Sequence, residues 1–275
     1  MSKHSFQSMP LSSWQPTRDT VQTYSQLLGK IRGALSPAQK HWWHISLHAT
    51  AVGLTTTPIP AGSQTFELAL DFTRHQLNLA ASHGETAVIP LTGQSAAAFC
   101  SATLSILHDW GIEPAIDRAK FADETAGTYK ATAVSAYWEA LSQIDAILKE
   151  FKAGFRGETS PVQLWPHHFD LAMVWLSGRL VPGQDPANAD YADEQMNFGF
   201  STGDDSVPEP YFYATAYRTP AGFTNATLPD NAYWHLGGWK GAVLPYAALV
   251  RAENPREMLL TFWRTAHEAG ANLMK

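Results

Sequence analysis

Hydrophobic residues recur at the spacing of an amphipathic α-helix in several parts of the chain. The longest stripe lies in residues 129–152, where the pattern predicts a helix with one apolar face. Similar spacing predicts helices over residues 17–35, from Ser95 to Gly111, and from Asn254 onward, and Ser and Asn commonly cap helix N-termini. The stripe of 129–152 consists of Val134, Tyr137, Trp138, Leu141, Ile144, Leu148 and Phe151.

Strict alternation of apolar and other residues marks a second kind of element. Phe66, Leu68, Leu70 and Phe72 alternate with Glu67, Ala69 and Asp71, which predicts a strand with one buried face. Residues 43–56 and 162–176 are rich in β-branched and aromatic residues, so we expect a strand in each of them. Further strands are predicted at residues 76–81, 86–91, 196–201, 211–217 and 241–246.

The second half of the chain repeats the first. Residues 31–47 and 155–171 are related by an offset of 124, and seven of these seventeen positions are identical. Average amino-acid usage would supply about one match by chance. The identical pairs are Arg32/Arg156, Gly33/Gly157, Ser36/Ser160, Pro37/Pro161, Gln39/Gln163, His44/His168 and Leu47/Leu171.

This repeat predicts an α+β fold built by internal duplication. Each half reduces to a helix, four strands and a helix, so we expect mainly antiparallel sheets packed about a pseudo-twofold axis. The first repeat is expected at residues 14–116 and the second at residues 128–275, with residues 117–127 as a connector.

Composition excludes two function classes. The net charge is −6 and basic residues do not cluster, so the chain lacks the electrostatic footprint of a nucleic-acid binder. No apolar run has the length of a membrane span, and we expect a cytoplasmic protein that binds no membrane. Charged residues make up 16% and aromatic residues 12%, a balance that a homodimer interface would explain.

The richest polar cluster is residues 165–170, at the start of a predicted strand. Alternate residues of a strand share a face, so His168 and Asp170 would stand about 6.6 Å apart. They could serve as a general base with an orienting carboxylate, or as two metal ligands. The structural alternative is a buried histidine with its partner, which has the better prior odds.

The repeat adds further candidates for a ligand pocket. His44 occupies the position that matches His168, and Trp43 and Trp165 would supply aromatic walls. Tyr211 and Tyr213 share one face of a predicted strand and could line the same pocket, although core packing is the more ordinary interpretation.

A metal site is left open by the sequence. On a helix His44 and His48 would suit zinc, but on the predicted strand they lie about 13 Å apart, too far for one ion. No cofactor motif is present, and the single cysteine, Cys100, is read as a small buried residue.

Several short motifs stand out along the chain: HWWH at 41–44, GLTTTPIP at 53–60, SPV at 160–162, FDLA at 169–172, VPEP at 207–210 and VLPY at 243–246. Together they resemble a bacterial family catalogued as domain of unknown function 5996, and the likeness covers nearly the whole chain. The resemblance implies a bacterial, cytoplasmic protein and assigns no catalytic residue.

Two functions from different classes follow as predictions. The first is a small-molecule-binding protein or enzyme whose pocket contains His44, His168 and Asp170, with His168 as the catalytic base. The second is a non-catalytic scaffold or protein-interaction module, in which the same histidines are structural.

Overall fold

A computed structural model describes residues 6–274 and divides the chain into two compact units. The N-terminal-sheet unit comprises Trp14–Glu139 and Leu164–Phe169. The C-terminal-sheet unit comprises the described residues up to Ser13, then Ala140–Gln163, and the chain from Asp170 onward. Together they form an α+β fold with two antiparallel sheets of six strands each.

The first sheet is a meander with short strands at one edge. Its order is β1-β2-β4-β5-β6, and β3 pairs with β4. The alternation of residues 66–72 has its expected effect, because Phe66, Leu68 and Leu70 are buried and pair across β5 with Ala81, Leu79 and Leu77. The strands are β1 (His48–Ala49), β2 (Gly53–Thr55), β3 (Ile59–Ala61), β4 (Gln64–Asp71), β5 (Gln76–Ala81) and β6 (Thr86–Pro90).

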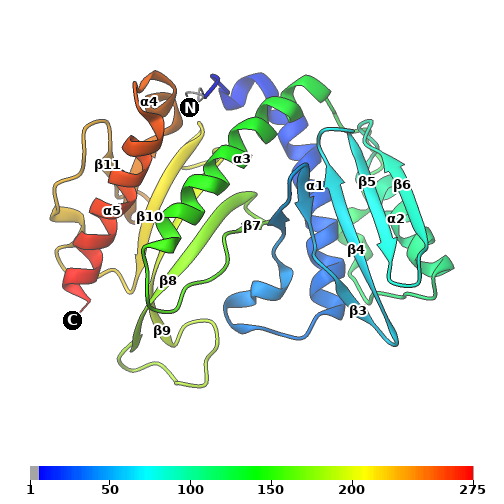
Figure 1. Ribbon diagram of the computed structural model, residues 1–275, viewed down its shortest axis with the longest axis horizontal. Helices are drawn as coiled ribbons and strands as arrows, with labels where there is room; N and C mark the ends of the chain where they lie inside the picture. The colour runs from blue at the N-terminus through cyan, green and yellow to red at the C-terminus, as the bar shows by residue number, and fades with distance from the viewer. Residues whose placement is uncertain (1–5, 275) are drawn as a thin grey trace. The chain divides into compact units, whose positions relative to one another are not determined.

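Two helices lie behind this sheet in Figure 1, α1 (Leu11–Leu35) and α2 (Ala96–Asp109). They contact each other through Tyr24 and Phe99, whose stacked rings have centroids 4.0 Å apart. Ser95 caps α2 as predicted, since its side chain accepts a hydrogen bond from the Ala98 N–H at 3.1 Å.

The second sheet has the order β11-β12-β10-β9-β8-β7. Its central strands pair antiparallel, with Tyr213 opposite Gly199 on one side and Val243 on the other. The strands are β7 (Gln163–Trp165), β8 (Asp170–Leu180), β9 (Asp193–Ser201), β10 (Tyr211–Tyr217), β11 (Tyr233–His235) and β12 (Gly241–Pro245).

Helices cover one face of the second sheet. The later part of α3 (Ala131–Ala153) and α5 (Pro255–Leu273) meet there, and α4 (Tyr246–Arg251) precedes α5 (Figure 1). Phe151 of α3 lies 4.9 Å from Phe198 and 5.7 Å from Trp263 of α5, measured between ring centroids. Trp263 in turn packs on Phe212 of β10, so the Phe198 and Phe212 face of the sheet is the core of this unit.

Two predicted strands differ in the structure. Residues 40–45 form a 3₁₀ turn, in which His41 and Trp42 have φ of 52° and 59°. The buried guanidinium of Arg32 fixes this turn, because it donates hydrogen bonds to the carbonyl oxygens of Trp43 at 3.1 Å and Ser46 at 2.5 Å. The prediction of one strand over residues 43–56 was therefore wrong in its first part.

The second difference lies between β7 and β8. Residues 166–169 form a turn, and Phe169 has a φ of 57°, so the single strand predicted over 162–176 is broken. Phe169 holds this conformation with its ring buried and stacked on Tyr137, 5.3 Å between centroids. The local pattern of β-formers could not reveal this, because tertiary packing overrides strand propensity here.

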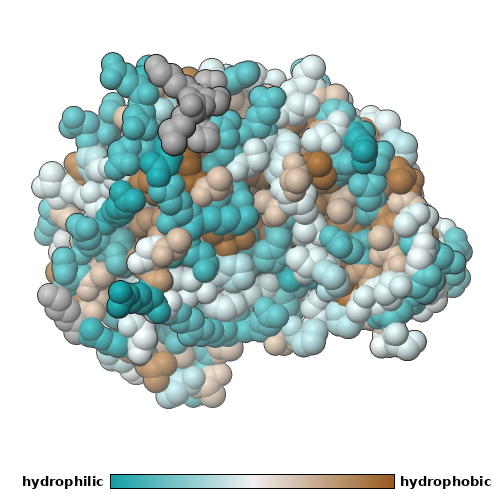
Figure 2. All heavy atoms as spheres, viewed as in Figure 1, coloured by the Kyte–Doolittle hydropathy of each residue, from teal (hydrophilic) through white to brown (hydrophobic). Residues whose placement is uncertain are grey.

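On the face of the molecule drawn in Figure 2, hydrophobic residues are scattered among hydrophilic ones. Single exposed apolar residues are normal on soluble surfaces. The homodimer expected from composition therefore stays a prediction. The large hydrophobic residues that remain exposed are Trp42, Val52, Val88, Leu180, Tyr191, Tyr233, Leu236 and Leu273.

Candidate functional site

The face of the second sheet opposite α3 and α5 is only half buried and carries a row of aromatic residues. On β10, Phe212, Ala214 and Ala216 are buried on the helix-covered face, whereas Tyr213, Thr215 and Tyr217 are half-buried on the other. Antiparallel sheets often pack one face and leave the other partly in water. A row of tyrosines, however, is more aromatic than a solvated face requires.

Tyr213 crosses this face to reach Asp170, the first residue of β8. The Tyr213 hydroxyl donates a hydrogen bond to Asp170 Oδ2 at 2.5 Å. Gly199 of β9 lies between them, and a Cβ built there would stand 2.6 Å from the Tyr213 hydroxyl oxygen and 2.6 Å from the Leu171 carbonyl oxygen. The phenol can cross because this position has no side chain.

Tyr211 forms a second pair with Asp204. Its hydroxyl donates to Asp204 Oδ2 at 2.5 Å, while Asp204 Oδ1 accepts from the Ser206 N–H at 2.8 Å and the Val207 N–H at 3.0 Å. The turn after β9 is thus closed by the Asp204 carboxylate, which also accepts the Tyr211 hydroxyl.

Two further rings extend the aromatic surface. Trp239 stacks with Tyr211 at 6.1 Å between centroids and 20° between planes, and His235 lies 4.5 Å from Trp239. The Trp239 indole N–H donates to Ser206 Oγ at 3.1 Å, which ties the ring to the Asp204 turn. We call this group the Tyr–Asp face: Asp170, Asp204, Tyr211, Tyr213, His235 and Trp239.

Burial and the carboxylates set the protonation of the Tyr–Asp face. Burial, followed by the hydrogen bond and charge of Asp204, raises the pKa of Tyr211. Burial and the charge of Asp170 likewise raise the pKa of Tyr213 well above its ordinary value. Both phenols are therefore neutral donors near pH 7.

The pKa of Asp204 is shifted downward, unlike the raised pKa values of the two tyrosines. Burial would raise the pKa of its carboxyl, but hydrogen bonds from Ser206, Tyr211 and Val207 outweigh burial and hold that pKa below its usual range. The face therefore combines an ionised carboxylate with electron-rich rings, and it is suited to attract positive charge.

The sequence candidates fall into two groups. Asp170, Tyr211 and Tyr213 belong to the C-terminal-sheet unit, and the structure brings them together, with the two tyrosine rings 6.2 Å apart. His44, Trp43, Trp165 and His168 belong to the N-terminal-sheet unit.

His168 does not lie on a strand. It is exposed in the turn of residues 166–169, and its ring lies 4.4 Å from that of His167. The spacing argument that set His168 beside Asp170 assumed an extended chain, and this premise was wrong because Phe169 has a positive φ. Asp170 instead accepts the hydroxyl of Tyr213.

The other candidates of the N-terminal-sheet unit have local roles. His44 is buried, and its Nδ1 accepts a hydrogen bond from the Gln39 N–H at 3.2 Å. The Trp43 ring lies 5.6 Å from the ammonium of Lys40. Trp165 is half-buried, 6.0 Å from the ring of His167.

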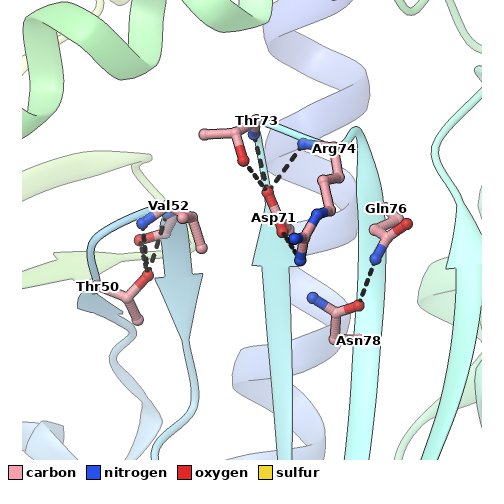
Figure 3. Close-up of polar contacts among 8 residues, drawn as sticks. Thr50, Val52, Asp71, Thr73, Arg74, Gln76 and Asn78 are labelled. Atoms are coloured by element: carbon pink, nitrogen blue, oxygen red, sulfur yellow. Dashed lines mark hydrogen bonds and ion pairs between the residues drawn. The ribbon is translucent and has the colours of Figure 1, made fainter.

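A second polar cluster, at the β4–β5 turn, is structural (Figure 3). Asp71 Oδ1 accepts hydrogen bonds from the Thr73 N–H at 2.9 Å, the Thr73 hydroxyl at 2.7 Å and the Arg74 N–H at 2.9 Å. Burial raises the pKa of Asp71, but these bonds outweigh it and leave the pKa below its usual range. The Oδ1 atom of Asp71 thus closes the hairpin, and Oδ2 lies 3.8 Å from the Arg74 guanidinium.

Two features are absent among the described residues, a cluster of metal-binding side chains and a helix both long and apolar enough to span a membrane. Within residues 6–274, no three histidine, cysteine or acidic side chains gather as a metal site would require. No helix among these residues is long and apolar enough to cross a bilayer.

The fold is that of an α+β protein with two antiparallel six-stranded sheets, the second of which carries the Tyr–Asp face. The chain belongs to the family of unknown function DUF5996, whose model matches residues 6–275, so the resemblance drawn from the HWWH and FDLA motifs is confirmed. No curated protein and no solved structure matches the chain.

Sequence reasoning missed Asp204, His235 and Trp239. Asp204 lies in the turn after β9, where one carboxylate oxygen closes the turn and the other accepts the Tyr211 hydroxyl. His235 and Trp239 lie in and after the short strand β11, where no hydrophobic period was available to place them. The spacing of Asp204 and Ser206, two residues apart, was the one signal in the sequence for a turn closed by a carboxylate.

Proposed function

We propose that the protein binds a small organic cation on the Tyr–Asp face. The observation that carries the proposal is that two neutral phenols, each held by a carboxylate, have their rings 6.2 Å apart, and that one of them, Tyr211, stacks with Trp239. A cation over such rings gains about 0.5–2 kcal/mol from each good contact, and the carboxylates add attraction.

An anionic ligand is disfavoured by the same chemistry. It would approach the ionised Asp204 and the negative faces of the rings, and the two hydroxyls that could donate to it are already engaged. A neutral flat ligand would stack but would leave the carboxylates without a counter-charge. The ligand class that satisfies rings and carboxylates together is an amine or quaternary ammonium.

The catalytic interpretation of His168 and Asp170 stays a prediction, with Asp170 now better explained as the acceptor of Tyr213. The non-catalytic scaffold remains the competing class. In that case the tyrosines rigidify the sheet and no ligand stabilises the protein. The two classes differ in one measurable property, the response of stability to a cation.

We also infer that the two sheets descend from one duplicated unit. In each half a long helix, α1 or α3, precedes an antiparallel meander, β2-β4-β5-β6 or β8-β9-β10-β12, and a helix follows. The repeated sequences AVIP at 87–90 and AVLP at 242–245 fall on β6 and β12, the last strands of the two meanders. This topology supports the duplication, and the repeat boundaries 14–116 and 128–275 stay predictions.

Calorimetry and thermal shift with matched ligands test the cation proposal. Choline and its neutral isostere 3,3-dimethylbutan-1-ol differ in charge and hardly in shape. We expect choline to bind and to raise the melting temperature, and the alcohol to do neither. Potassium chloride at the same ionic strength controls for general salt effects.

Variants locate the site. Asp204→Asn removes charge from the face, and Trp239→Leu removes a ring, so both should weaken choline binding. Tyr191→Phe, at an exposed tyrosine outside the Tyr–Asp face, is the control variant and should leave choline binding unchanged. The proposal fails if no amine or ammonium in a broad panel binds, or if the neutral alcohol binds as well as choline.

A further inference from the structure

A cavity of about 420 Å³ opens on α2 of the N-terminal-sheet unit, and none of the residues that line it belongs to the Tyr–Asp face. Its volume lies toward the small end of the ~300–1,000 Å³ that is typical of ligand pockets. Cys100, Ser101, Leu104 and Ser105 line it from α2, and Arg118 and Phe121 line it from the following 3₁₀ helix, Arg118–Phe121.

The cavity has an apolar floor and a polar rim. Cys100, Leu104 and Phe121 are buried, with exposed fractions of 5%, 6% and 4%. Ser101, Ser105 and Arg118 are exposed. This arrangement suits a ligand with a small apolar body and a polar end.

Among the described residues, some charged side chains at the rim of the cavity are paired with each other, and one is not. Glu113 and His108 also line the cavity, and the His108 ring nitrogen Nδ1 hydrogen-bonds to a Glu113 carboxylate oxygen. That bond and the Glu113 charge raise the pKa of His108, so the Glu113 carboxylate favours the protonated form of the ring beside it.

Arg118 has no such counter-charge. Among residues 6–274, its guanidinium takes part in no hydrogen bond or ion pair. Its charge acts on the Cys100 thiol, where it opposes the larger effect of burial, which raises the pKa of that thiol. A free guanidinium therefore stands next to the apolar floor, with the Ser101 and Ser105 hydroxyls on the same wall.

We propose that this cavity binds a small amphipathic carboxylate. The apolar body would contact Leu104 and Phe121, and the carboxylate would pair with Arg118, whose planar fork of donors matches two carboxylate oxygens. The Ser101 and Ser105 hydroxyls would donate to the same group. The proposal is independent of the cation site, because it rests on a different unit and on opposite charge.

Cys100 is a built-in reporter, because it is the only cysteine of the chain and lines the cavity. The full chain is alkylated with iodoacetamide in the presence of 3-phenylpropionate or its neutral amide, and modification is followed by mass spectrometry. We expect the carboxylate to slow alkylation at least several-fold and the amide to leave the rate unchanged. Calorimetry with the same two compounds gives the affinity whatever the rate of alkylation.

Matched variants assign the charge. Arg118→Gln should weaken carboxylate binding roughly tenfold or more, since a hydrogen bond to a charged group contributes about one such factor. Lys120→Gln removes an exposed cation from the same 3₁₀ helix but not from the cavity wall, and it should leave binding unchanged. Ser105→Leu should fill the cavity and block binding while keeping Arg118.

Three results would overturn the proposal. Equal binding of acid and amide would show that charge is not recognised. Equal loss in Arg118→Gln and Lys120→Gln would reduce the effect to general electrostatics. Absence of calorimetric binding across short aryl and alkyl carboxylates, in protein that remains folded, would leave the cavity without the proposed ligand class.

Discussion

Gly199→Ala should break the hydrogen bond between Tyr213 and Asp170 by direct steric overlap. The new Cβ would lie 2.6 Å from the Tyr213 hydroxyl oxygen, 2.7 Å from its ring carbon Cζ and 2.6 Å from the Leu171 carbonyl oxygen. The phenol must move off β9, so Asp170 loses its donor. Overpacking costs about 1–3 kcal/mol and a hydrogen bond to a charged group about 1.5–3 kcal/mol, so we expect a loss of about 3 kcal/mol or more.

Urea denaturation followed by circular dichroism measures this loss, and a double-mutant cycle with Tyr213→Phe isolates its origin. Tyr213→Phe alone removes the hydroxyl and keeps the ring. If the alanine acts by displacing that hydroxyl, the two losses are less than additive by about 0.5–3 kcal/mol. Strict additivity, or a Gly199→Ala variant within about 0.5 kcal/mol of the native protein, would refute the reasoning.

Three further predictions concern other parts of the fold. Arg32→Met should cost about 2–4 kcal/mol, because it leaves the Trp43 and Ser46 carbonyl groups without their donor, whereas Arg156→Met, its exposed match in the repeat, should change urea stability little. The pKa of Asp71 is lowered in the fold, so the ionised carboxylate stabilises the folded state above the ordinary carboxyl pKa, and this stabilisation is lost as acid protonates the group. Asp71→Asn should therefore make the free energy of unfolding depend less on pH in that acidic range. Burial lowers the pKa of His267 to about 4, so the folded state favours the neutral ring. The free energy of unfolding should therefore fall as the pH drops from about 6.5 to 4. His267→Phe should make this fall smaller, as measured by urea denaturation at a series of pH values.

The elements set by local chemistry could be predicted from the sequence. The α2 cap at Ser95 and the α5 cap at Asn254 were predicted because a capping side chain acts within three residues. The alternation of residues 66–72 was equally local, and it matches the burial of β4. Strand number was underestimated, because short pieces such as β3 and β11 carry too few residues for a period.

The rest depends on contacts between distant residues. Arg32 imposes the turn at residues 40–45, and stacking on Tyr137 accompanies the positive φ of Phe169. In the candidate site, Asp170 and Tyr213 were both predicted as site residues, but the hydrogen bond between them was not predicted. They are far apart in sequence, and what joins them is the missing side chain of Gly199, which no pattern of hydrophobic residues reports.

The Tyr213–Asp170 bond spans three strands, reaching from β10 over β9 to β8. A slip of one residue in the β9–β10 pairing would turn Tyr213 toward the helix-covered face of the sheet and point Phe212 away from the core. The correct alignment is therefore the one in which phenol and carboxylate meet above a glycine. The hydrogen bond between Tyr213 and Asp170 therefore adds its free energy only to the native register of the three strands.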